Sequence, residues 1–113
     1  MTNPLAIVSA LPQELELLRD AAIHKSDLEL APGVRAWRGT LDDQDVVLAE
    51  SGIGKVAMAL VVTALITSQR PRLIVFTGVA GGIDPELNVG DVVVADRLIQ
   101  HDAGVYQPAG IEV

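Results

Sequence analysis

Cysteine is absent from this chain of 113 residues, and aromatic side chains make up only 3% of it. Without cysteine, disulfides, thiolate nucleophiles and cysteine-ligated zinc sites are excluded, and a reducing compartment is compatible with the chain. We therefore expect a cytoplasmic protein. Because aromatic rings are so few, aliphatic side chains must fill the core, which suits a sheet covered by helices.

Basic residues are also scarce: 8 Lys and Arg stand against 15 Asp and Glu, which gives a net charge of −7. They form no cluster, so nucleic acid and anionic membrane surfaces are poor partners. The longest apolar stretch, residues 56–67, is too short to span a bilayer. The N-terminus lacks the basic segment of a secretory signal. We expect neither nucleic acid nor a membrane as a partner.

Short aliphatic runs alternate with segments of helical periodicity. Strands are expected at residues 5–8, 34–40, 45–50, 73–76 and 92–95, and helices at 13–23 and 56–68. This order indicates an α/β fold with a parallel or mixed sheet. Only two helices are visible, whereas both faces of such a sheet need cover. Residues 1–113 therefore read as the first half of a larger domain.

Two glycine-rich turns carry the strongest functional signal. Residues 51–55 (Ser-Gly-Ile-Gly-Lys) and 77–82 (Thr-Gly-Val-Ala-Gly-Gly) each follow an expected strand. Ligands of open α/β sheets bind outside the carboxyl ends of strands, where glycine lets backbone N–H groups approach them. Glycines can also simply end strands, and for either turn alone the two interpretations are about equally good. Both turns together favour a small-molecule site.

Other motifs are weaker. Neither the phosphate-loop spacing nor the G-x-G-x-x-G dinucleotide pattern is present, and no metal-ligand spacing is seen. Glu14 falls in the first turn of the first helix, directly after the first strand, where the helix dipole stabilises a carboxylate. It is either a solvent-facing residue at a helix start, which spacing alone favours, or a functional carboxylate at the edge of the sheet.

Three motifs together resemble the 5′-methylthioadenosine/S-adenosylhomocysteine nucleosidases of the nucleoside phosphorylase superfamily. They are residues 6–14, residues 51–56 (Ser-Gly-Ile-Gly-Lys-Val) and residues 77–96, which include Thr-Gly-Val-Ala-Gly-Gly and Val-Gly-Asp-Val-Val. His-Asp-Ala at 101–103 is also similar. The motifs keep the order of the family, and the resemblance runs over essentially the whole chain.

The resemblance implies a three-layer αβα fold and hydrolysis of the N-glycosidic bond, with release of adenine and without cofactor or metal. It also implies a homodimer, or a completing C-terminal segment. Glu14 would position and deprotonate the attacking water. Leu11, Ile53 and Gly54 would line the pocket. Val79, Ala80 and Gly81 would border the ribose and the base.

Two departures from the family are visible. Val79 stands where better-known members have a serine or threonine, so a hydroxyl contact is lost. The family domain is about twice as long as this chain, and its ribose-binding glutamate and its proton-donating aspartate lie in the other half. We therefore expect residues 1–113 alone not to be catalytically competent.

Two alternatives remain open from the sequence. A purine nucleoside phosphorylase of the same superfamily would need a basic anion site, and Arg97 is the only arginine near a motif. A non-catalytic nucleoside-binding protein would keep the first two motifs and lack the rest.

Overall fold

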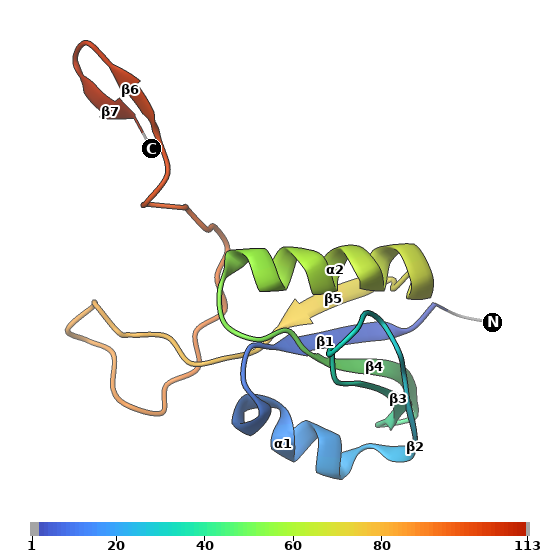
Figure 1. Cartoon of the computed structure of the whole chain (residues 1–113). Coiled ribbons are helices and arrows are strands. Elements are labelled where there is room, and N and C mark those ends of the chain that lie inside the picture. The colour runs from blue at the N-terminus through green and yellow to red at the C-terminus, as the bar shows by residue number, and fades with distance from the viewer. Residues whose placement is uncertain (1–2, 113) are drawn as a thin grey trace. The chain divides into compact units, whose positions relative to one another are not determined.

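Five strands form one mixed sheet in the order β2-β3-β4-β1-β5 in the computed structural model, which describes residues 3–112 (Figure 1). The strands are β1 (Leu5–Ser9), β2 (Ile23–Asp27), β3 (Ala36–Leu41), β4 (Gln44–Glu50) and β5 (Leu73–Phe76). Strand β1 is parallel to β4 and β5, and β3 is antiparallel to β2 and β4. The chain divides into two compact units, up to Ala80 and from Gly81 onward, and each is described by itself.

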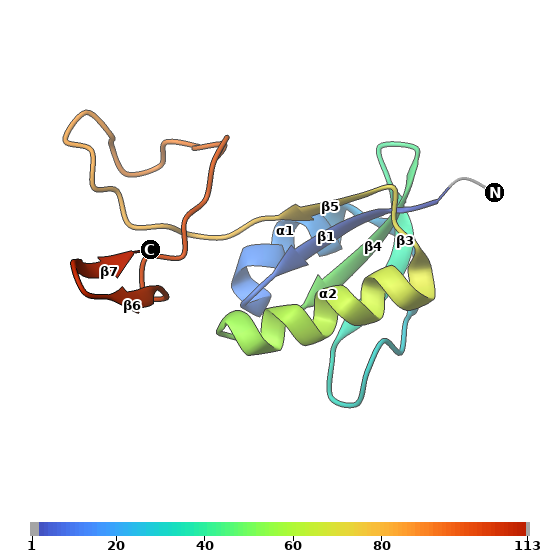
Figure 2. The same ribbon diagram turned by 90° about the horizontal axis from the view of Figure 1, so that it is seen from above.

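The core of the first unit lies in two layers, one on each face of the sheet (Figure 2). Successive strand residues point to opposite faces. On the face of helix α2 (Lys55–Gln69), the buried side chains are Ala6, Val8, Ala36, Val47, Ala49, Val61 and Leu65. On the face of helix α1 (Pro12–Ala21), they are Ile7, Leu15, Ala22, Val46 and Leu48. The three-layer αβα arrangement is thus confirmed for this unit.

Helix α1 begins at a proline, whose missing N–H costs nothing in the first turn. Its C-terminus is held by Lys25, whose Nζ donates to the carbonyl oxygens of Arg19 at 2.7 Å and of Ala22 at 2.8 Å. A lysine that binds the last free carbonyl groups stabilises a helix end. The helix ends at Ala21, because the backbone of Ala22 is extended (ψ 137°).

Strand β2 is a correction to the expected pattern, because the helix predicted over 13–23 ends earlier and Ile23 starts this strand. All five β2 residues are exposed, and the strand pairs only with β3, with a shift in register between Ile23 and Ser26. His24 lies in that irregularity with a φ of 53°. Backbone pairing rather than burial forms this edge strand, so no apolar alternation marks it.

The other expected elements of the first unit are close to those observed. Strand β5 has the predicted bounds, while β4 and α2 extend the predicted segments by one residue at one end or both. Strand β3 begins at Ala36, two residues later than predicted.

The second unit contains a hairpin, formed by β6 (Val105–Gln107) and β7 (Gly110–Glu112), where the sequence predicted no strand. The strand predicted over 92–95 is wrong: these residues are not in a strand, and Val92 and Val94 are each 90% exposed. A run of valines favours extended backbone, but a strand forms only where a neighbour accepts its hydrogen bonds. Within residues 3–112, no helix has the length and apolar character needed to cross a membrane.

We expect Leu15→Ala to lower the free energy of unfolding by about 2–5 kcal/mol, because it leaves a cavity between α1 and the sheet. Leu15 is completely buried. Leu17 lies on the same helix but is 84% exposed, so Leu17→Ala is the matched control and should cost less than about 0.5 kcal/mol. Urea unfolding of both variants measures this, and equal effects would contradict the packing described for α1.

Candidate functional site

The carboxyl ends of β1, β4 and β5 meet at one edge of the sheet, because the three strands are parallel and adjacent. Backbone hydrogen bonds continue past the strands. The N–H of Ser51 donates to the carbonyl of Ser9 at 2.8 Å, and the N–H of Gly52 donates to that of Ala10 at 3.1 Å. On the other side, the N–H of Thr77 donates to the carbonyl of Val8 at 3.0 Å. Both glycine turns therefore start beside the end of β1, and each directly follows a strand, as the sequence predicted.

Glu14 reaches this edge from the first turn of α1. Its Oε2 accepts a hydrogen bond from the N–H of Leu11 at 2.9 Å, which is the glutamate half of a capping box. Its Oε1 accepts one from the N–H of Val79 at 3.3 Å, across 65 positions of sequence. The half-buried carboxylate thus joins the start of α1 to the turn after β5.

The Glu14 side chain is turned toward the edge of the sheet and does not extend freely into solvent, because both of its oxygens accept backbone hydrogen bonds. A carboxylate can accept about four hydrogen bonds, and two backbone donors are bound here. Lone pairs remain for a further donor, such as a water molecule or a hydroxyl group. The helix N-terminus also stabilises negative charge at this point.

The first glycine turn needs glycine at two positions. Gly52 has a φ of +79° and Gly54 a φ of +103°, backbone conformations that a residue with a Cβ rarely adopts. Gly54 is also the residue before α2, and its carbonyl accepts the N–H of Met58 at 3.1 Å. Ile53 lies between them with its side chain 79% exposed. The turn therefore presents an apolar side chain from a fixed backbone.

The second glycine turn lies against Glu14 through Gly78. A Cβ added at Gly78 would lie 3.3 Å from Oε1 of Glu14 and 3.1 Å from Cζ of Phe76. The position therefore favours glycine because of close approach rather than because of an unusual φ. Val79 is 89% exposed, and Ala80 is also exposed. Gly81 begins the second unit.

Hydrogen bonds therefore bring Leu11, Glu14 and Val79 together. Two further residues at this edge were not expected from the sequence. Gly78 was visible only as part of a turn motif, because its contact with Glu14 depends on the tertiary fold. Glu50, the last residue of β4, is only 8% exposed. Its signal in the sequence is its position, because it is an acidic residue at the end of an apolar strand, directly before the first glycine turn.

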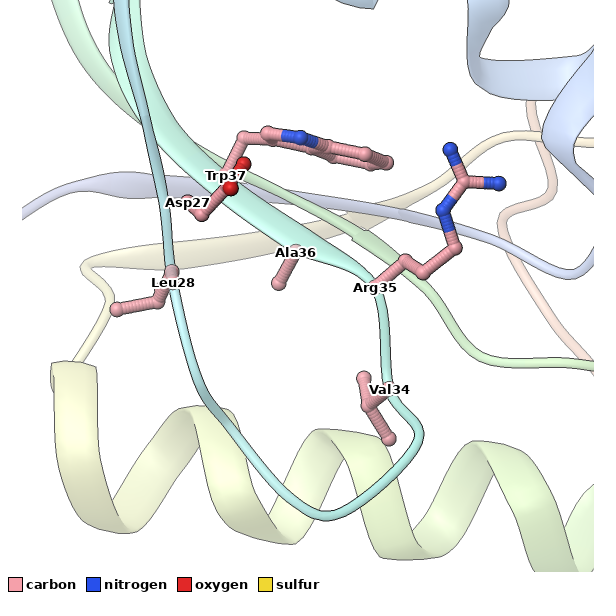
Figure 3. Close-up of a pocket in the computed structure, with 6 residues that line it drawn as sticks. All are labelled: Asp27, Leu28, Val34, Arg35, Ala36 and Trp37. Atoms are coloured by element: carbon pink, nitrogen blue, oxygen red, sulfur yellow. The ribbon is translucent and has the colours of Figure 1, made fainter.

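A shallow hollow of about 370 Å³ lies beside β3 (Figure 3). It is lined by Asp27, Leu28, Val34, Arg35, Ala36 and Trp37. None of these residues was predicted as a site residue. In Figure 3, Val34 points toward α2, whereas Trp37 and Arg35 lie on the other side of the strand.

Metal ligands do not gather in the described part of the chain: no group of three His, Asp or Glu side chains there could hold a metal ion. The site described here consists of one carboxylate, backbone N–H groups and small or aliphatic side chains. Such a site can accept a hydrogen bond from a ligand through its carboxylate, beside an apolar surface.

Comparison with known proteins places this chain in a family. The chain belongs to the phosphorylase superfamily, whose family model matches residues 4–111. More particularly, it is similar to 5′-methylthioadenosine/S-adenosylhomocysteine nucleosidases, which confirms the resemblance seen in the three motifs. It is 43% identical to the one from Mycobacterium tuberculosis, over 98% of this chain and 46% of that protein. It is 41% identical to the one from Tolumonas auensis, over 92% of this chain and 46% of that protein.

Solved structures give the same result. The chain superposes on the nucleosidase from Streptococcus pneumoniae in complex with 8-aminoadenine with a TM-score of 0.86 and 36% identity, covering 90% of this chain and 45% of that one. For the Neisseria meningitidis enzyme in complex with methylthio-immucillin-A, the TM-score is 0.75 and the identity 34%, over 80% and 38% of the two chains. The chain thus spans somewhat less than half the length of the relatives that it matches.

We expect Gly78→Ala to disturb the contact between Glu14 and Val79, because the new methyl group would press on Oε1 of Glu14. The amide resonance of Leu11, which donates to the same carboxylate and is remote from position 78 in sequence, measures this disturbance in a ¹⁵N-correlated NMR spectrum. Gly81→Ala is the control, since a Cβ there meets nothing within 4 Å. An unchanged Leu11 resonance in Gly78→Ala would contradict the close packing of the turn on Glu14.

Proposed function

We propose that this protein takes part in hydrolysing the N-glycosidic bond of 5′-methylthioadenosine and S-adenosylhomocysteine, with release of adenine. The observation that carries the proposal is the carboxylate of Glu14, held by the N–H groups of Leu11 and Val79 at the edge where the two glycine turns meet. The similarity to nucleosidases, whose solved structures contain adenine or nucleoside analogues, supports it.

In this proposal Glu14 is the general base. Two of its acceptor positions are bound to backbone N–H groups, which fix the carboxylate, and its remaining lone pairs orient and deprotonate the water that attacks the anomeric carbon of the ribose. Cleavage of a glycosidic bond also needs a proton on the leaving group. We assign no residue among 1–113 to that role, and we propose that these residues are the N-terminal half of a phosphorylase superfamily domain.

The substrate-binding residues are proposed from the same edge. Leu11 packs near the sugar, because it directly precedes α1, donates its N–H to Glu14 and remains 39% exposed. Ile53 and Gly54 supply one apolar wall from the first turn. Val79, Ala80 and Gly81 border the ribose and the base from the second turn. The glycines allow close approach of backbone N–H groups to the nucleoside.

We propose a homodimer as the assembled state. We also propose that the protein is cytoplasmic, because the absence of cysteine is compatible with a reducing compartment. The outer face of α2 supports the dimer. No charged residue occurs over 56–69, and Val56, Leu60 and Ile66 are 86%, 54% and 54% exposed. An exposed apolar patch of this kind is typical of an interaction surface. The mass of the protein in solution over a range of concentrations tests the proposal.

We expect Glu14→Gln to lower turnover by roughly 10²–10⁴ in the protein expressed from its complete gene, because the change keeps the shape of the side chain but removes the base. Binding of adenine should survive. Glu16→Gln is the matched control: Glu16 lies on the same helix and is exposed, so its loss should leave turnover nearly unchanged. If the two variants behave alike, Glu14 has no special role.

The nucleophile separates hydrolysis from phosphorolysis. Phosphate needs several positive or N–H donors to replace its hydration, and a carboxylate beside the anomeric carbon repels it. We therefore expect the protein to release adenine and free methylthioribose from methylthioadenosine in phosphate-free buffer. Chromatography of the products measures this. A sugar 1-phosphate formed only when phosphate is added would indicate the phosphorylase alternative. Binding of adenine without any turnover would indicate a non-catalytic nucleoside-binding protein.

A further inference from the structure

Glu50 is a buried carboxylate that the proposed chemistry does not use. It is the last residue of β4, it is 8% exposed, and its neighbour along the chain is Ser51 of the first glycine turn. Its Oε1 accepts no hydrogen bond from the described residues. Burying a charge is costly unless a partner compensates it, so the surroundings of Glu50 require an explanation.

Two arginines from different elements supply the compensation. Nη1 of Arg35, in the connection before β3, lies 3.4 Å from Oε2 of Glu50, and Nη1 of Arg19, on α1, lies 3.9 Å from Oε1. The backbone N–H of Glu50 also donates to the carbonyl of Arg35 at 2.9 Å. One carboxylate thus ties β4, α1 and the segment before β3 together.

Trp37 restrains the same two arginines. The guanidinium carbon of Arg19 lies 5.5 Å from the centre of the Trp37 ring, and that of Arg35 lies 5.3 Å from it. Both distances are within the range of cation–π attraction. Figure 3 shows the Arg35 guanidinium extending past the edge of the indole, on the same side of β3. Each arginine is therefore fixed by an aromatic ring as well as by a charge.

From this geometry we propose that Glu50 is a positioning residue for Glu14. Arg19 and Glu14 lie on the same helix, five residues apart, so an ion pair that fixes one end of α1 fixes the direction in which the other end presents its carboxylate. The first turn is anchored at the same place, because the N–H groups of Ser51 and Gly52, directly after Glu50, bind the carbonyls of Ser9 and Ala10. This inference rests on the proposed role of Glu14, and its test does not depend on turnover.

A matched control exists on the same strand. Asp45 also pairs with an arginine: Arg38 donates to it through Nε at 3.1 Å and through Nη2 at 2.5 Å, a contact that raises the pKa of Arg38. Asp45 lies at the amino end of β4 and Glu50 at its carboxyl end. Removing either carboxylate deletes an ion pair of β4, but only Glu50 is near the candidate site.

The experiment follows the amide protons of Leu11 and Val79, the two donors to Glu14, by NMR of the protein expressed from its complete gene. Glu14→Ala removes the carboxylate, so it gives the resonance positions of the Leu11 and Val79 amides without their hydrogen bonds to Glu14. Glu50→Gln should shift both resonances in the direction seen in Glu14→Ala, and exchange of both amides should become about 3- to 10-fold faster, the factor expected for weakening one hydrogen bond. Asp45→Asn should leave both amides unchanged.

Arg19→Met provides a second route if Glu50→Gln does not fold, because it breaks the link to α1 without removing the buried carboxylate. It should shift the same two amides in the same direction. Unchanged amides in the folded Glu50 or Arg19 variant, or equal shifts in Asp45→Asn, would overturn the proposal. Failure of the protein to release adenine, with these shifts observed, would overturn the proposed function and leave Glu50 as the residue that positions the Glu14 side chain.

Discussion

Strand β1 is hydrogen-bonded in parallel on both of its edges, and the rest of the site depends on that constraint. With β4 on one side and β5 on the other, three carboxyl ends face the same edge of the sheet. Parallel strands cannot be joined by tight turns, so the chain must cross over between them, through α1 or α2. The connections that leave this edge contain the two glycine turns and the start of α1. The place of the site follows from the pairing of one strand.

The same strand explains how the two helices are held. Ala6 and Val8 point toward α2, whereas Ile7 points toward α1. A strand with apolar side chains on both faces can only be stable with cover on both. Because α1 is packed on one face through Leu15, its N-terminus comes to lie beside the end of β1. Glu14, one residue before Leu15, is thereby presented at the edge rather than at the solvent side of the helix.

How much of this fold could be predicted from the sequence depends on whether an element forms by burial or by pairing. The strand predicted at residues 5–8 lies within one residue of the observed β1, because a strand that is paired on both edges and covered on both faces is apolar along its length. Strand β2 could not be predicted, since its polar residues are held only by hydrogen bonds to β3. At residues 92–95 the reverse holds: the residue types predict a strand, but none forms. Propensity is a local property, whereas a strand needs a partner.

The candidate site shows the same division. The positions of Glu14 and of the two glycine turns could be predicted, because each is marked by a residue type at the end of an element. Their contacts could not, because Glu14 and Val79 are 65 positions apart. For Glu50, the carboxylate is visible in the sequence, but its partners Arg19 and Arg35 are separated from it by 31 and 15 positions and are brought to it only by the packing of α1 and β3.

The capping role of Glu14 and the general-base role that we propose for it have requirements that do not conflict. A capping carboxylate must hold its helix end in one conformation, and a general base must present a lone pair in one direction. Both are met by a carboxylate that accepts from Leu11 through one oxygen and from Val79 through the other, because each oxygen has two acceptor positions. The hydrogen bonds that stabilise the start of α1 are thus the same ones that restrict the carboxylate to a single orientation. In this way a local rule of helix stability also supplies the pre-organisation that proton transfer requires.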